Sequence, residues 1–148
     1  MKVSTKVQYG LIALADIAIN SVNKTLVSSS DISVRQNISQ KYLEQILTYL
    51  KQAGFIKAHK GSGGGYTLSR SAETIKMSEV LNALDNSILT GTFQPESNCE
   101  NRLHDSVNAF FWEKINGCLM EFAHSMTLKD FITQCFECRG NDWDMYVI

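Results

Sequence analysis

The chain has 148 residues, of which 44% are hydrophobic and one is proline, and its formal net charge at pH 7 is −1. This length and composition are typical of one globular domain, alone or with a short appendage. No apolar run reaches the roughly 18 residues of a membrane span, and the apolar N-terminal stretch contains Asp16 and lacks a cleavage-like site. We therefore expect a cytoplasmic protein without a membrane partner.

The charge is unevenly distributed along the chain. Residues 1–80 contain ten Lys or Arg and five Asp or Glu, whereas residues 81–148 contain four and ten. Chance segregation is one explanation. The other, which we favour, is that the N-terminal part meets a polyanion such as nucleic acid and the C-terminal part does not.

The N-terminal half predicts three helices and a hairpin. Residues 4–20 carry apolar side chains on one face, and three serines before Asp31 offer N-caps for a second helix. Ser39 can cap a third helix over residues 40–53, and Gly54 suits the left-handed position that follows a helix. Two strand-like runs, residues 55–58 and 66–68, flank a glycine-rich turn.

Helix, tight turn, helix and hairpin in this order predict a winged helix-turn-helix, whose second helix enters the DNA major groove. At its start, Lys41 can bond guanine and Gln45 can bond adenine. An ordinary surface helix would also be polar on one side, but the hairpin that follows favours DNA. The candidate DNA-contacting residues of this helix and the wing are Ser39, Lys41, Tyr42, Gln45, Lys60, Gly63 and Gly64.

The C-terminal half predicts a different organisation. Ser78 is a candidate cap for a short helix that ends near residue 84, and residues 87–102 form a polar linker. Apolar residues spaced three or four apart predict a long helix over residues 103–126, with more apolar surface than one short domain needs. Thr127 can cap a last helix over 128–136. We thus divide the chain into an N-terminal DNA-binding part (1–86), a linker that is a candidate effector or sensor loop (87–102), a pair of C-terminal helices (103–136) and a tail (137–148).

Four stretches resemble a known family: KVSTKVQYGLIALADIAIN from Lys2, ISQKYLEQIL from Ile38, LKQAGFIKAHKGSGGGYTL from Leu50 and ETIKMSEVLNALD from Glu73. They are similar to the bacterial winged helix-turn-helix regulators of the Rrf type, which include IscR, NsrR and CymR. The specific signal is YLEQIL followed by the G-x-G-G-G-Y wing. The resemblance implies a mainly α fold with a small β-hairpin wing and a long C-terminal dimerisation helix.

The resemblance also implies functional residues. Thr5 and Lys6, at the start of the first helix, are expected to meet the phosphate backbone. A homodimer is expected to bind a pseudo-palindromic operator in double-stranded DNA, and we interpret it as a repressor. The expected dimer interface lies on the long helix and comprises Phe111, Ile115, Leu119 and Phe122.

Relatives that bind an iron–sulfur cluster place three cysteines in the loop before the dimerisation helix. Here that loop contains one, Cys99, and His104 follows it. One thiolate and one imidazole cannot hold a cluster within one subunit. We therefore expect no cofactor and no metal, and we name Cys99 and His104 as the possible sensor. The alternative is that Cys99 has no regulatory role and that the effector is a small molecule or another protein.

The remaining three cysteines are expected to have structural places or to be free thiols, and functions other than DNA binding are less well supported. Cys118 is expected in the core, and Cys135 and Cys138 are expected as a pair of thiols, with half of a zinc site as the alternative. The glycine turn lacks the Lys-Ser/Thr of a phosphate-binding loop, so we expect no enzyme. The competing function is a winged-helix protein–protein interaction module with no DNA role.

Overall fold

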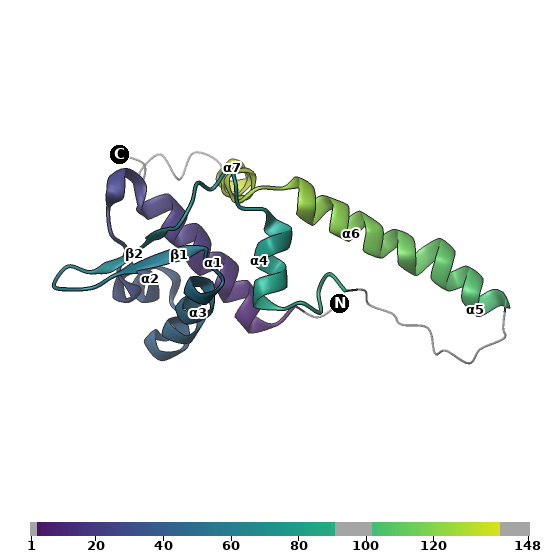
Figure 1. Ribbon diagram of the computed structural model, residues 1–148, viewed down its shortest axis with the longest axis horizontal. Coiled ribbons are helices and arrows are strands. Elements are labelled where there is room, and N and C mark those ends of the chain that lie inside the picture. The colour runs from purple at the N-terminus through teal and green to yellow at the C-terminus, as the bar shows by residue number, and fades with distance from the viewer. Residues whose placement is uncertain (1–2, 91–101, 140–148) are drawn as a thin grey trace.

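The computed structural model describes residues 3–90 and 102–139. It is mainly helical, with one antiparallel hairpin, as predicted. Figure 1 shows the hairpin and a long C-terminal helix at opposite ends of the molecule, with a bundle of shorter helices between them. Within the described residues, no helix meets the length and hydropathy needed to cross a membrane.

The three N-terminal helices form where their caps predict them. They are α1 (Thr5–Asn20), α2 (Ser29–Gln36) and α3 (Gln40–Gln52), and a short 3₁₀ turn, η1 (Val22–Lys24), follows α1. The hydroxyl oxygens of Ser4, Ser28 and Ser39 each accept a hydrogen bond from a backbone N–H three residues later, at 3.3, 3.0 and 3.3 Å. These caps stabilise the helix starts by satisfying donors that have no partner inside the helix.

The hairpin pairs β1 (Ile56–His59) with β2 (Gly65–Leu68), so that Ile56 lies opposite Leu68. The first strand begins one residue later than predicted because Phe55 is buried and its N–H bonds to the carbonyl of Leu50 at 3.0 Å. Tyr66 exchanges two backbone hydrogen bonds with Val27, at 3.1 and 2.8 Å. The base of the wing is therefore fixed to the segment that leads into α2.

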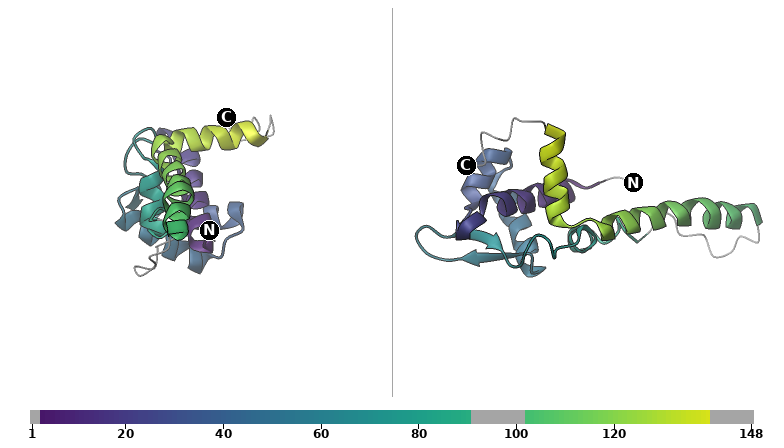
Figure 2. Two further views of the ribbon diagram at one scale, coloured as in Figure 1. Left: turned by 90° about the vertical axis from the view of Figure 1, so that its right-hand side faces the viewer. Right: turned by 90° about the horizontal axis from the view of Figure 1, so that it is seen from above.

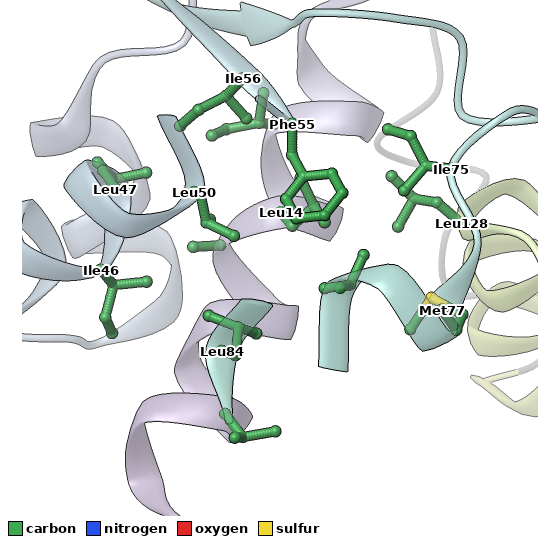
Figure 3. Packing of buried hydrophobic residues seen from close by; sticks show 14 of the residues in the cluster. Leu14, Ile46, Leu47, Leu50, Phe55, Ile56, Ile75, Met77, Leu84 and Leu128 are labelled. Atoms are coloured by element: carbon green, nitrogen blue, oxygen red, sulfur yellow. The ribbon is translucent and has the colours of Figure 1, made fainter. Parts of the chain in front are cut away.

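The hydrophobic core of the described residues lies where α1, α3, α4 (Met77–Leu84) and the base of the hairpin meet (Figure 3). The predicted apolar face of α3 is confirmed, because Leu43, Ile46, Leu47 and Leu50 are all 1% exposed or less. Leu14 of α1 is also buried completely. This face fixes α3 rigidly, which leaves its opposite side available for contacts outside the chain.

The prediction that Ser78 caps α4 is wrong. Ser78 is buried within the helix, and Lys76 occupies the cap position, where its N–H donates to the Glu79 carboxylate at 3.2 Å. A hydrogen bond from Arg70 lowers the pKa of that carboxylate, which keeps it ionised as an acceptor. Lys76 is also paired with Thr127 in an isolated β-bridge, a long-range contact that a local capping rule does not include.

The predicted long helix is present with one irregularity. It comprises α5 (Arg102–Val107), a π-helical turn η2 (Asn108–Trp112) and α6 (Glu113–Ser125), and it projects away from the N-terminal bundle (Figure 2). The last helix, α7 (Leu128–Arg139), is three residues longer than predicted. Its expected cap is confirmed, because the N–H of Asp130 donates to the Thr127 hydroxyl at 3.1 Å.

Candidate nucleic-acid interface

The outer side of α3 is polar. Lys41 and Gln45 are exposed as predicted, and Ser39, which caps the helix, is exposed as well. Tyr42, which we named as a candidate DNA-contacting residue, is half-buried, and its ring packs edge-on against Tyr9 of α1 at a centroid distance of 5.8 Å. The tyrosine therefore joins α3 to α1, since its aromatic body favours burial.

Gln40 and Glu44 also lie on this surface, in the first turns of α3. The side-chain amide of Gln40 donates to the hydroxyl of Ser29 at 2.7 Å and to the carboxylate of Glu44 at 3.0 Å. Gln40 thus links the start of α2 to the first turn of α3. Helical spacing alone could have suggested the Gln40–Glu44 contact, but the contact with Ser29 depends on the turn between the helices.

The N-terminus of α1 lies beside α3. The ammonium group of Lys6 sits 3.7 Å from the centroid of the Tyr49 ring, in cation–π geometry, and Tyr49 is 47% exposed. Thr5 is also exposed. This contact brings the positive charge predicted for phosphate binding to the flank of α3, and sequence reasoning did not predict the part that Tyr49 plays in it.

The tip of the wing exposes a cation and bare backbone. Lys60 is exposed, and Gly63 has a φ of 78°, which favours glycine. A Cβ built on Gly63 would have no heavy atom of the described residues within 4 Å. A Cβ on Gly64 would instead lie 2.3 Å from the carbonyl oxygen of His59. We expected both glycines to present backbone to DNA, but the space beside Gly64 is filled by the hairpin itself.

The long C-terminal helix exposes large apolar side chains. Phe110, Phe111 and Phe122 are 71%, 55% and 60% exposed, and Ile115 is 41% exposed. Leu119, which we assigned to the dimer interface, is half-buried and packs against the core of its own chain. Its i+4 position relative to Ile115 did not show that the helix turns that side towards α4.

The cysteines do not form a metal centre within the described residues, where no three His, Cys, Asp or Glu side chains come together. Cys118 is exposed, so the expectation that it lies in the core is wrong, and Cys135 and Cys138 are exposed on α7. His104 is exposed on α5. Cys99 lies outside the described residues, so its sensor role stays a prediction.

The chain is similar over most of its length to a family of transcriptional regulators. The model of the Rrf2 family, described as an iron-dependent transcriptional regulator, matches residues 3–134. The transcriptional regulator IscR of Cereibacter sphaeroides is 38% identical over 136 residues, covering 89% of this chain and 87% of that protein. IscR of Vibrio vulnificus is 32% identical over 133 residues, covering 90% of this chain and 78% of that protein.

Two solved structures of transcriptional regulators are similar in fold to this chain. CymR of B. subtilis, described as the global cysteine regulator, superposes with a TM-score of 0.78 at 27% identity, covering 90% of this chain and 98% of that chain. IscR of T. potens superposes with a TM-score of 0.73 at 32% identity, covering 99% and 96%.

Proposed function

This chain belongs to the Rrf2 family of bacterial transcriptional regulators, and we propose that it acts as a homodimeric repressor that reads a pseudo-palindromic operator. The prediction that it is not an enzyme is confirmed, since its relatives are transcriptional regulators. A repressor of bacterial transcription acts where the chromosome lies, so we propose a cytoplasmic location.

One observation carries the proposal. The polar residues of α3 face outward while four buried apolar residues fix the helix from behind, and Lys6 lies at its flank. A rigid helix with exposed hydrogen-bonding side chains can read base edges, because direct readout requires donors and acceptors held in fixed geometry. Lys6 and Lys60 supply the charge that phosphate contacts require.

The test is a selection of binding sites from random duplex DNA, followed by affinity measurements at several salt concentrations. We expect a selected half-site repeated with two-fold symmetry and an affinity that falls steeply as salt rises. The alternative, a winged-helix protein–protein interaction module, predicts no enriched sequence and no salt-dependent DNA binding. That result would exclude the proposed function.

Replacing Gln45 with alanine should relax the preference for one base pair in each half-site, at a cost of about 1–3 kcal/mol in discrimination. Lys6→Ala should instead weaken binding to all sequences alike, because a phosphate contact carries no sequence information. Gln134→Ala, at an exposed position of α7, is the matched control. Unchanged base preference in Gln45→Ala would contradict the proposed docking of α3.

The family description includes iron, but the donor set of this chain does not fit a cluster held by one protomer. The sequence between α4 and α5 contains a single cysteine, Cys99, and His104 follows it five residues later. Thiolates are the usual ligands of such clusters. We therefore propose that regulation here does not use a complete iron–sulfur site and that Cys99 is the residue to test as a sensor.

Protein purified without oxygen should contain no stoichiometric iron or sulfide and should show no visible charge-transfer absorption. A mild oxidant should lower DNA affinity in the native protein and leave the affinity of Cys99→Ser unchanged, because a cysteine thiol reacts with oxidants through its thiolate. Stoichiometric iron and sulfide would overturn the first part. An oxidant response that survives in Cys99→Ser would point to the exposed cysteines Cys118, Cys135 and Cys138 instead.

A further inference from the structure

A buried carboxylate joins α1 to α2, away from the exposed face of α3. Among the described residues, Asp16 is the one charged residue that is buried, with a side chain 1% exposed, whereas the side chain of its partner Arg35 is 39% exposed. Asp16 comes from α1, and Arg35 from the last turn of α2. No part of the proposed DNA contact uses this pair directly.

Four side-chain donors surround the carboxylate. Oδ1 of Asp16 accepts from Nη2 of Arg35 at 2.6 Å and from Nδ2 of Asn20 at 3.2 Å. Oδ2 accepts from Nε of Arg35 at 3.1 Å and from Nε2 of Gln36 at 2.6 Å. The Asp16 carboxylate raises the pKa of the Arg35 guanidinium, chiefly through this hydrogen bonding. The two-pronged arginine contact and the Gln36 amide together fix both the position and the orientation of the end of α2.

The end of α2 that Asp16 holds lies immediately before α3, the helix that we propose contacts the DNA bases. Asn37 follows Gln36 with a left-handed φ of 52°, and the Ser33 hydroxyl donates to the carbonyl of Ile38 at 2.6 Å. The N–H of Ile38 donates to the carbonyl of Ser33 at 3.2 Å. Three residues separate Gln36 from the first residue of α3. A shift of the end of α2 is therefore transmitted through a short, hydrogen-bonded turn to the start of α3.

The same α1 helix carries the proposed phosphate contact at its other end. Lys6 lies ten residues before Asp16, so about 15 Å of continuous helix joins them. Lys6 lies over Tyr49, so α1 contacts α3 near the C-terminal end of α3. Through Asp16 and Arg35, α1 also holds the turn that leads into the N-terminal end of α3. Asp16 thereby fixes the distance between Lys6, the proposed contact with DNA phosphate, and the residues of α3 that we propose contact the bases.

Stability alone is a weak reason for such a pair. Removing a carboxylate from water costs several kcal/mol, and apolar replacements of similar volume are often neutral or stabilising. We propose that Asp16 is a positioning residue for DNA reading, which holds the end of α2, and through it the start of α3, in the geometry that operator recognition requires. This inference rests on the proposed DNA-binding function.

The decisive variant is the double replacement Asp16→Leu with Arg35→Met, which leaves the net charge unchanged and fills the same space with apolar side chains. Its melting temperature should match or exceed that of the native protein. Its affinity for the selected operator should fall at least about tenfold, the effect of one lost base contact of roughly 1.4 kcal/mol. Its affinity for a random duplex of equal length should stay within about twofold, because the phosphate contacts remain.

Asp16→Asn supplies an independent readout, because it removes a negative charge and retains Arg35. Electrostatics alone would strengthen its binding to all DNA. We expect weaker operator binding in the folded protein, and Arg35→Lys, which keeps the charge and loses the two-pronged contact, should bind with an affinity between those of the Asp16→Asn and native proteins.

Native operator affinity in the folded double variant would overturn the inference. Unfolding of both Asp16 variants would also overturn it, because stability would then explain the pair. Failure of the native protein to bind any selected duplex would instead remove the proposed function, on which the inference rests. These outcomes separate the two claims.

Discussion

Phe111→Asp should convert the protein to a monomer at micromolar concentration and weaken operator binding by roughly a hundredfold or more. The Phe111 side chain is 55% exposed in the single chain, and it lies on a helix that projects from the core with other exposed aromatic residues. An aspartate placed in an apolar interface between two copies would bury an unpaired charge, which disfavours association strongly. A monomer loses the gain from simultaneous contact with two half-sites, commonly about 10²–10⁴.

Sedimentation and operator titration measure the two parts of this result separately. Val22→Asp is the matched control, because Val22 is 59% exposed and lies in the short turn after α1 rather than on the long helix. The control should remain dimeric and bind the operator normally. A Phe111→Asp protein that stays dimeric would place the interface elsewhere, and a native protein that is monomeric would remove the homodimer from the proposal.

Local sequence signals predicted those parts of the molecule whose causes are local. The spacing of Leu43, Ile46, Leu47 and Leu50 predicted the buried face of α3, and Ser39 predicted its start. Both depend on contacts within one helix. The glycine-rich turn was predicted in the same way, since a positive φ at Gly63 is a property of a few neighbouring residues.

The features that were missed depend on contacts between distant segments. Lys76 replaces Ser78 at the start of α4 and forms a β-bridge with Thr127, which is 51 residues away in sequence. Cys118 was assigned to the core from its spacing, but much of α6 projects beyond the core and leaves that side exposed. Asp16 was noted as an interruption of an apolar run, and three of its four side-chain donors come from α2.

Gly64→Val should weaken operator binding by roughly a hundredfold in a dimer, although the core should remain folded. A Cβ at this position would lie 2.3 Å from the carbonyl oxygen of His59 and 3.0 Å from that of Gly61, so the hairpin turn must move. Displacing Lys60 would remove a charged contact of about 1.4 kcal/mol from each wing, which is about tenfold for each half-site. Affinity for the operator and thermal unfolding measure the two effects.

Gly63→Asn separates the shape of the wing from its closeness to DNA. Asparagine tolerates the left-handed φ of 78°, and a Cβ at this position would have no heavy atom of the described residues within 4 Å, so the hairpin should keep its form. If the backbone at the tip approaches the phosphates closely, Gly63→Asn should also weaken binding, because its side chain would occupy that space. Normal binding by Gly63→Asn together with weak binding by Gly64→Val would show that the wing contributes through Lys60 and its own fold. Normal binding by both variants would exclude a role for the wing in operator recognition.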